Sequence, residues 1–301
     1  RENTMHKKII LAAAIALIAI LSLSFFTACD DEEVQARAID LDSAQYRIFF
    51  DDFDGELDTT VWNTLHERRK GGYWDKDQVL TENGNLVIRT VEKDGTFYTG
   101  AVDSMNKKEL LFGYFEARCY LPKASGIWSA FWLMPQGMMY DAPSSDVNVC
   151  GAEIDIMESP YFNPVNNLLS KQLIENETYQ CAVHVGDYKK NYIKKEQFIN
   201  TQTAKTQVDI YDDWHTFGLD WSKDYYRFYF DRKLVFEITD KKYISTVEKD
   251  YLFLSVEVGG KNGIAQKPDF FFANSVFENP EGTFPVDFLV DYVAVYSKCP
   301  F

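Results

Sequence analysis

Short runs of alternating apolar and polar residues, separated by Gly, Asn and Asp, recur along the chain from residue 46 onward. A period of two is typical of β-strands that bury one face. The runs that show it best lie at 85–91, 113–121, 225–230 and 286–296. Helical periodicity is sparse, with one short helix expected within 166–178, and the spacing of βαβ units is absent. The pattern predicts an all-β domain over 46–301, built as a β-sandwich or jelly roll.

The N-terminal segment has a different pattern, in which a short basic stretch after Met5 precedes an unbroken apolar run, Ile9–Phe26. These are the n-region and h-region of a secretory signal. Small residues then precede Cys29, which resembles a bacterial lipobox, and a run of acidic residues follows. We therefore expect a lipoprotein signal peptide over 5–28 and an acidic tether over 29–45. Lipidation of Cys29 would anchor the protein to the bacterial outer membrane, exposed at the surface. A transmembrane anchor is the alternative, because roughly 18 apolar residues can also cross a bilayer.

Composition narrows the class of partner. The net charge of −15 argues against nucleic acid, because phosphate binding needs clustered Lys and Arg. Such a charge suits a protein that handles an uncharged polymer, or it serves only solubility. Aromatic residues make up 16% of the chain, which fits β-rich structure or a surface that stacks on flat ligands. We expect a monomer.

Four cysteines follow Cys29, and they form neither a Cys-x-x-Cys pair nor a His/Cys spacing typical of zinc. They are Cys119, Cys150, Cys181 and Cys299. Outside the cytoplasm, one or two disulfides and buried free thiols are equal alternatives.

The segment Glu153-Ile-Asp155-Ile-Met-Glu158 carries the candidate chemistry. If it is a strand, Glu153 and Asp155 share one face, and Glu158 lies on the other. A single β-bulge at Ile156–Met157 would bring all three carboxylates to the same side. The sequence therefore predicts a bulge at this position.

Three neighbouring acids suit the hydrolysis of glycosidic bonds. Like charges raise one another's pKa, and the reaction needs one ionised carboxylate beside one that holds a proton. A calcium site or a solvated edge strand is the alternative. Calcium loops place Gly and Asn between the acids, whereas the spacers here are Ile, Ile and Met.

This segment resembles the signature of glycoside hydrolase family 16, in its bulged form with one extra residue, and the resemblance extends through almost all of 46–301. In chain order, the other motifs that carry it are Phe50-Asp-Asp-Phe-Asp54-Gly, Gly113-Tyr-Phe-Glu-Ala-Arg118, Gly126-Ile-Trp128-Ser-Ala-Phe-Trp132-Leu-Met, Trp214-His215-Thr-Phe-Gly-Leu-Asp-Trp221 and Val290-Asp291-Tyr-Val-Ala-Val-Tyr296.

The resemblance implies a β-jelly-roll sandwich with a substrate cleft on its concave face, and a retaining double displacement without a cofactor. Glu153 would be the nucleophile, Glu158 the general acid and base, and Asp155 the residue between them. Retention places the two glutamate carboxyls about 5–5.5 Å apart.

Family position also suggests substrate-binding residues. Trp128 and Trp132 lie four residues apart, share one face of a strand and would line the cleft, with core packing as the alternative. Glu116 and Arg118 would contact substrate, unless they form an ordinary cross-strand ion pair. His184 would orient a carboxylate or bind a hydroxyl, unless it is a half-buried structural histidine.

Asp291 matches a position that supplies a calcium ligand on the convex face of many relatives, so a structural calcium is expected there. Two segments depart from the family pattern of β-1,3-glucanases. Gly71-Gly-Tyr-Trp74-Asp-Lys-Asp-Gln replaces an Asn-Asn-Glu-Leu-Gln-type segment, and Ser255-Val-Glu257-Val-Gly-Gly replaces an Asn-Leu-Ala-Val-Gly-Gly-like strand. Glu257 would therefore be a fourth carboxylate that contacts substrate.

Three functions remain open at this point. The resemblance implies endo-hydrolysis of β-1,3-glucan or mixed β-1,3/1,4-glucan, and the absence of a visible sulfate-binding basic cluster agrees with it. The departures at Trp74 and Glu257 favour an endo-β-galactosidase acting on algal galactan or mucin-type glycans. A non-catalytic glycan-binding lipoprotein is the third reading, although such a protein has no reason to keep all three carboxylates.

Overall fold

A computed structural model of the protein describes residues 46–124, 126–139, 144–160, 178–188, 190–201, 209–259 and 282–301. All of them belong to the second of two units, Ile39–Phe301. The expected signal peptide, Cys29, the acidic tether and the helix expected at 166–177 lie outside the described residues. Within the described residues, no helix is long and apolar enough to cross a membrane.

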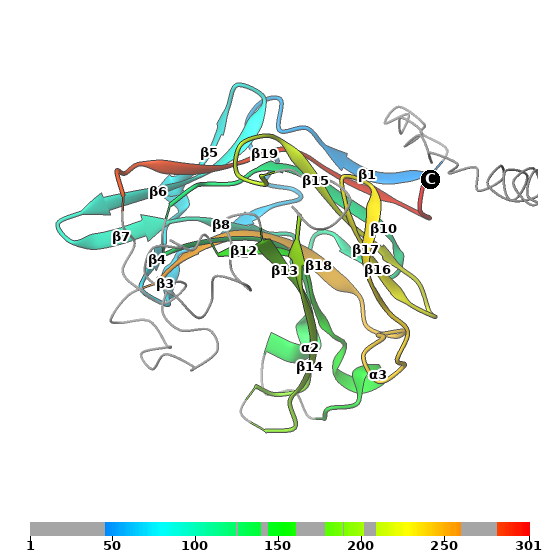
Figure 1. The fold of residues 1–301 in the computed structure, drawn as a ribbon. Coiled ribbons are helices and arrows are strands. Elements are labelled where there is room, and N and C mark those ends of the chain that lie inside the picture. The colour runs from blue at the N-terminus through cyan, green and yellow to red at the C-terminus, as the bar shows by residue number, and fades with distance from the viewer. Residues whose placement is uncertain are drawn as a thin grey trace, which may run out of the picture. The chain divides into compact units, whose positions relative to one another are not determined.

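Two β-sheets make up the described domain, as the layers in Figure 1 show. The eleven-stranded sheet runs in the order β17 (Lys233–Ile238), β16 (Tyr226–Phe230), β15 (His215–Trp221), β10 (Gly113–Tyr120), β19 (Val286–Tyr296), β6 (Asn85–Lys93), β7 (Thr96–Thr99), β4 (Gly72–Trp74) and β3 (Glu67–Arg69). In addition, β1 (Arg47–Asp51) pairs with β19, and β5 (Val79–Glu82) pairs with β6.

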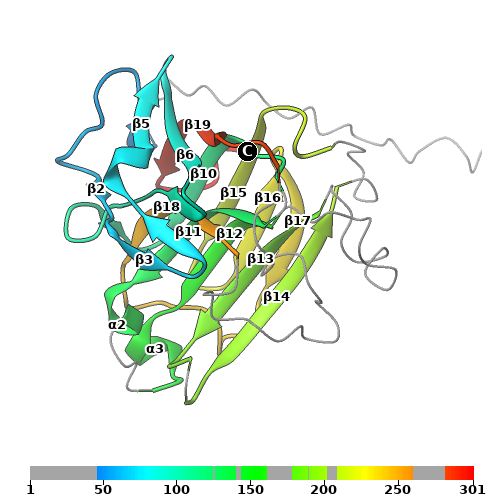
Figure 2. The same ribbon diagram turned by 90° about the vertical axis from the view of Figure 1, so that its left-hand side faces the viewer.

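The second sheet has eight strands, and Figure 2 shows its strands β14 to β11 in sequence. Its order is β14 (Ile193–Asn200), β13 (Thr178–Val185), β12 (Glu153–Pro160), β11 (Ile127–Pro135), β18 (Asp250–Val258), β8 (Ala101–Asp103) and β2 (Asn63–Thr64), with β9 (Glu109–Leu110) paired to β18. The all-β sandwich predicted from alternation is therefore confirmed.

The core lies between the two sheets, where alternate residues of each strand meet. Phe115 on β10 and Ile154 on β12 are wholly buried members of one continuous apolar cluster. Each such side chain stabilises the fold by about 1.5–3 kcal/mol relative to an exposed position. The cysteines described by the structure, Cys119, Cys150, Cys181 and Cys299, are free thiols, and the first three are buried.

The segment Gln136–Cys150 joins β11 to the segment before β12, and its described residues contain two short helices, α2 (Gln136–Met139) and α3 (Val147–Cys150). Local capping explains α3. The side chain of Asp146 accepts a hydrogen bond from the backbone N–H of Asn148 at the start, and Gly151, with φ of 74°, ends the helix. One 3-10 turn, η1 (Lys76–Gln78), follows β4.

The hairpin of β3 and β4 is held against the end of β18. The backbone N–H of Gly71 donates to the carbonyl of Val258 at 2.9 Å. A Cβ atom on Gly71 would lie 1.8 Å from the carbonyl oxygen of Gly259, so only glycine permits this approach. The preceding residue, Lys70, adopts a left-handed φ of 48°. This turn directs Arg69 and Lys70 over the eight-stranded sheet.

Candidate active site

The predicted bulge on β12 is present. On β13, Asp155 pairs with Ala182 and Glu158 pairs with Gln180, so β12 contains one more residue than its partner between these points. The register with β11 shifts at the same place. Ile156 and Met157 are both buried. The extra residue therefore returns Glu158 to the face that carries Glu153 and Asp155.

One open cleft contains all three carboxylates. The residues that line it come from β3 and its turn, β11, β12 and β18, and they are Arg69, Lys70, Trp128, Ala130, Trp132, Glu153, Asp155, Glu158, Ser255 and Glu257. The structure thus brings together both predicted tryptophans, the three acids and Glu257. Their roles in binding and catalysis remain predictions.

The surroundings of both glutamates favour their protonated forms. Burial, followed by the charge of Asp155, raises the pKa of Glu153 to about 7, so Glu153 is partly ionised at neutral pH. Burial and the same aspartate raise the pKa of Glu158 well above its usual value. One carboxylate and one carboxylic acid are the pair that glycoside hydrolysis requires.

His184 lies beside these acids, opposite Glu153 in the strand pairing. Its Nε2 is 3.0 Å from Oδ2 of Asp155, and its Nδ1 contacts the hydroxyl of Tyr192. Burial disfavours the imidazolium, but the hydrogen bond to Asp155 and the charges of the three acids outweigh it and raise the pKa of His184 to about 9. A protonated His184 therefore offsets part of the negative charge on β12.

The ligand atoms of Glu153, Asp155 and His184 lie within 4.8 Å of one another, a spacing that a metal ion also accepts. The contact between His184 and Asp155 has the length of a charge-assisted hydrogen bond. A proton on His184 accounts for that contact, so the group is an acid–base cluster and we assign no metal to it.

The two predicted tryptophans have different surroundings. Trp132 is largely buried, stacks on Phe253 with ring centroids 4.1 Å apart, and donates from Nε1 to the hydroxyl of Ser255 at 3.1 Å. Trp132 therefore packs in the core and also lines the cleft. Over the ring of Trp128, the ammonium of Lys70 lies 3.8 Å from the centroid, a cation–π contact.

Glu257 also lines the cleft, where two cations hold it. Nε of Arg69 is 2.5 Å from Oε1 of Glu257, and Lys70 contacts the other carboxylate oxygen. Burial alone would raise the pKa of Glu257, but Lys70 and Arg69 outweigh burial and hold it below its usual value. Sequence reasoning missed Arg69 and Lys70, because a basic pair in a hairpin is usually a solvated turn. The adjacent Gly71-Gly72 was the available signal of close packing.

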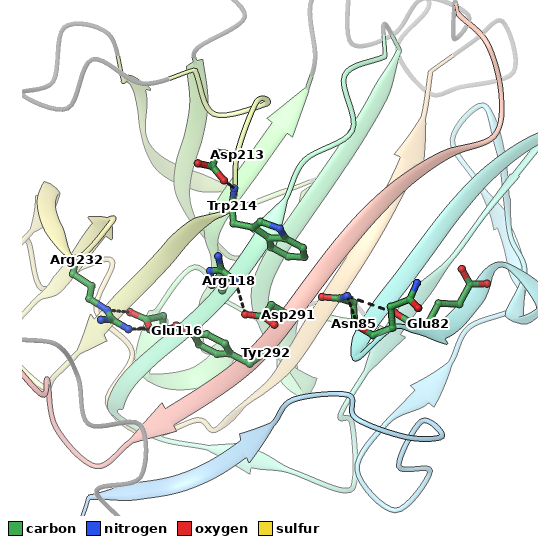
Figure 3. Close-up of polar contacts among 10 residues, drawn as sticks. Glu82, Asn85, Glu116, Arg118, Asp213, Trp214, Arg232, Asp291 and Tyr292 are labelled. Carbon is green, nitrogen blue, oxygen red and sulfur yellow. Dashed lines mark hydrogen bonds and ion pairs between the residues drawn. The ribbon is translucent and has the colours of Figure 1, made fainter.

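Glu116 was expected in the cleft, and the structure corrects this. Its strand, β10, pairs with β15 and β19 in the eleven-stranded sheet, away from the strands that line the cleft. Glu116 is wholly buried and accepts hydrogen bonds from Tyr114, Arg232 and Tyr292. Figure 3 shows Arg232 and Tyr292 beside it. The ion-pair alternative is the right one, because the carboxylate is fully used within the fold.

Arg118 is displaced from the cleft for the same reason. Its guanidinium donates to Oδ2 of Asp291 at 2.7 Å and lies 5.0 Å from the ring of Trp214, as Figure 3 shows. A structural calcium was expected at Asp291, whose carboxylate is paired with Arg118 in this structure. The calcium stays a prediction.

Two tyrosines of the site were not identified from the sequence. Tyr188 and Tyr192 belong to the turn that joins β13 to β14, the hydroxyl of Tyr192 contacts Nδ1 of His184, and the ring centroids of Tyr188 and His184 are 5.9 Å apart. The signal in the sequence was weak, since two tyrosines in a polar turn are common, although they follow His184 closely.

The comparisons with known proteins agree with this geometry. A family model described as "Beta-porphyranase A-D, GH16 domain" matches residues 46–275. A β-glucanase of Rhodothermus marinus is 28% identical over 229 residues, which cover 71% of this chain and 68% of that protein. A glucan endo-1,3-β-glucosidase A1 of Niallia circulans is 23% identical, and the match covers 83% of this chain but only 38% of that protein. A laminarinase structure from Flavobacterium sp. UMI-01 has a TM-score of 0.59 and 25% identity, with 83% of this chain and 99% of that one covered.

Proposed function

Because this chain belongs to glycoside hydrolase family 16, we propose that it hydrolyses internal β-linkages of a polysaccharide with retention of configuration. The observation that carries the proposal is the bulge at Ile156–Met157, which returns Glu158 to the face of Glu153 and Asp155. Without the extra residue, Glu158 would point into the core and could not act on a substrate in the cleft.

The chemistry follows from the two protonation states. The carboxylate of Glu153 attacks the anomeric carbon, the bond from that carbon to the leaving oxygen breaks, and Glu158 gives its proton to that oxygen. Glu158, now ionised, then takes a proton from water, whose oxygen attacks the same carbon and releases Glu153 as a carboxylate. Asp155 and its partner His184 keep the charge around the pair balanced.

A β-1,3-glucan or mixed β-1,3/1,4-glucan is the substrate we propose first. The curated relatives of Rhodothermus marinus and Niallia circulans carry glucanase names, and the similar solved structure is a laminarinase. The cleft with Trp128 and Trp132 supports a polymer of flat sugar rings.

An algal galactan is the second candidate, supported by the family description, which names β-porphyranases. One feature of the cleft agrees with it. Arg69 and Lys70 directly precede one of the two segments that depart from the glucanase pattern, and they enter the cleft beside Glu257, which lies in the other. The sequence showed no basic cluster, yet these two cations against one carboxylate leave a local positive charge.

A panel of polysaccharides tests both candidates. Purified protein is incubated with laminarin, barley β-glucan, porphyran, agarose and gastric mucin, and released oligosaccharides are separated by chromatography. We expect oligosaccharides of several lengths from laminarin or barley β-glucan, with the β-anomer formed first in the NMR spectrum. Products from porphyran or mucin alone would replace the glucan proposal with the second candidate. No product from any polymer would contradict hydrolysis itself and favour a binding protein.

We also propose that a lipid on Cys29 anchors a monomer to the outer membrane, on the support of the lipobox-like segment in the sequence. Expression of the full chain and of Cys29→Ala in a Gram-negative host tests it. The unaltered chain is expected in the membrane fraction and labelled by a fatty-acid probe. Equal membrane retention and no label in either protein would contradict lipidation and favour the transmembrane alternative.

A further inference from the structure

One residue of β12 has no partner in the register of either neighbouring strand. Along β11, the pairing passes from Asp155 directly to Met157 and leaves out Ile156. Along β13, it passes from Asp155 to Glu158, so that Cys181 alone faces the two residues between them. Ile156 is therefore the extra residue of the bulge, and Cys181 is the residue across from it.

The thiol of Cys181 is joined to the bulge by a hydrogen bond. Its Sγ lies 3.4 Å from the backbone oxygen of Ile156, and the thiol is the donor because a carbonyl oxygen can only accept. Both residues are buried. A buried carbonyl that finds no donor costs free energy. The thiol thus supplies a donor at the point where the bulge interrupts the pairing of β12.

The position of Glu158 depends on this backbone more than the position of Asp155 does. The carboxylate of Asp155 has a direct partner in His184. Among the residues that the structure describes, none forms a hydrogen bond with the carboxyl of Glu158. The next residue, Ser159, is fixed by a hydrogen bond of 2.6 Å between its hydroxyl and that of Tyr211. The backbone between Asp155 and Ser159 therefore sets where the carboxyl of Glu158 lies.

We propose that Cys181 is a positioning residue for Glu158. Its thiol holds the carbonyl of Ile156, fixes the bulge in one conformation and so keeps the carboxyl of Glu158 within reach of the leaving oxygen. Cys181 belongs to the apolar core and not to the described lining of the cleft, so it acts through the backbone of β12 alone. This inference rests on the proposed function, in which Glu158 is the general acid.

Cys119 offers a matched comparison for a role in packing alone. It is also a wholly buried free thiol of the same apolar cluster, but it lies on β10 of the eleven-stranded sheet. Within the part of the chain that the structure describes, the thiol of Cys119 has no hydrogen-bond partner. Replacement by Ala removes the same volume at both positions, whereas only at Cys181 does it also remove a hydrogen bond.

Infrared spectroscopy tests the hydrogen bond without a substrate. The S–H stretching band lies apart from the absorption of other protein groups, and a hydrogen bond from the thiol lowers its frequency. Subtraction of the spectrum of Cys181→Ala from that of the wild type isolates the band of Cys181, and Cys119→Ala isolates the band of Cys119 in the same way. We expect the Cys181 band at the lower frequency. Equal frequencies would overturn the inference, whatever the activity.

Kinetics distinguish a displaced general acid from a damaged fold. A sugar leaving group needs the proton of Glu158, whereas a dinitrophenolate leaves without one. We expect Cys181→Ala to lower kcat/KM on the order of ten-fold for the polysaccharide that the panel identifies, because a small misplacement of a catalytic group is costly. For the dinitrophenyl glycoside of the matching oligosaccharide, kcat/KM should fall by about two-fold or less. Cys119→Ala should leave the ratio of the two values unchanged.

A conservative variant separates the hydrogen bond from the volume of the side chain. Cys181→Ser keeps a donor on a shorter bond, so it should retain more activity on the polysaccharide than Cys181→Ala. If the alanine variant does not fold, Cys181→Ser replaces it in both measurements, with a smaller loss that is again confined to the polysaccharide.

The two proposals fail in different ways. Glu158→Ala serves as the reference, because loss of the acid itself should affect the polysaccharide far more than the dinitrophenyl glycoside. If the wild type is active and Glu158→Ala shows this difference, but Cys181→Ala loses activity equally on both substrates or on neither, then this inference alone fails. If the wild type cleaves neither substrate, the proposed function fails and this role of Cys181 fails with it.

Discussion

At the scale of single residues, three carboxyl groups on one strand differ because their surroundings differ. Burial and Asp155 raise the pKa of Glu158 well above its ordinary value, while the pKa of Glu153 is raised to about 7, with the charges of His184 and Arg69 opposing the same two effects. Asp155 has His184 as its own partner. The division of roles between acid and nucleophile therefore arises from neighbours that are distant in sequence.

Replacement of the proposed nucleophile is the direct test of the mechanism. Glu153→Gln keeps the size and hydrogen-bonding capacity of the side chain but cannot attack carbon, so we expect turnover to fall by on the order of 10⁴-fold or more. Binding of the polysaccharide, measured by calorimetry, should persist. Undiminished hydrolysis in this variant would sink the assignment.

The same substitution should affect stability in a pH-dependent way. The folded-state pKa of Glu153 is raised to about 7 from 4.5, so the folded protein binds this proton more tightly than the unfolded chain does. Stability is thus lost as pH rises from about 4.5 through 7, by on the order of 3 kcal/mol. Glu153→Gln removes this loss, and it should raise the melting temperature relative to the wild type at pH 8 but not at pH 4. An equal shift at both pH values would contradict the raised pKa.

At the scale of elements, a bulge and a hairpin shape the cleft. The bulge on β12 decides which face Glu158 occupies, and the β3–β4 hairpin brings Arg69 and Lys70 to Glu257. In the proposed function, the bulge places the carboxylates that carry out the reaction. The hairpin places Lys70 over the ring of Trp128 and so affects which substrate binds.

Gly71→Ala tests the hairpin. A Cβ at this position meets the carbonyl oxygen of Gly259 at 1.8 Å, and the hairpin must move off the end of β18. We expect KM to rise several-fold with a smaller change in kcat, because the three carboxylates on β12 are untouched. Gly95→Ala is the control for destabilisation outside the cleft, because nothing lies within 4 Å of the added atom while the φ of 74° strains the backbone. The outcome that contradicts this role is an identical KM in wild type and Gly71→Ala.

At the scale of the whole described domain, the two sheets divide function from stability. The eight-stranded sheet carries most of the cleft, to which the eleven-stranded sheet adds Arg69 from β3. Other polar side chains of the eleven-stranded sheet pair with one another, as Glu116 does with Arg232 and Arg118 does with Asp291. Tyr114, Tyr292 and Tyr296 belong to one buried cluster, and the first two donate hydrogen bonds to Glu116. These polar groups are therefore satisfied within the fold.

Glu116→Ala should reveal this division. The substitution leaves Arg232 half-buried without its carboxylate, and a broken buried ion pair costs about 3 kcal/mol or more. We expect a lower midpoint of urea unfolding and an unchanged KM for the protein that remains folded. A raised KM at unchanged stability would return Glu116 to the list of substrate contacts.

The fold class and the bulge were accessible from the sequence because both depend on a local period of two. Alternation along 113–121 and 286–296 predicts strands, and the parity of Glu153, Asp155 and Glu158 predicts the extra residue between them. These inferences need only the order of side chains along one strand.

Which sheet a strand joins, and which turns reach the cleft, were decided by tertiary structure alone. Alternation places Glu116 and Arg118 on one face of their strand, yet only the pairing of β10 with β15 and β19 shows that this face lies away from the cleft. Arg69 ends the three-residue strand β3 and Lys70 lies in the turn after it, a segment too short to show a period. Their contacts with Glu257 join chain segments far apart in sequence, and a local pattern contains no information about such long-range pairing.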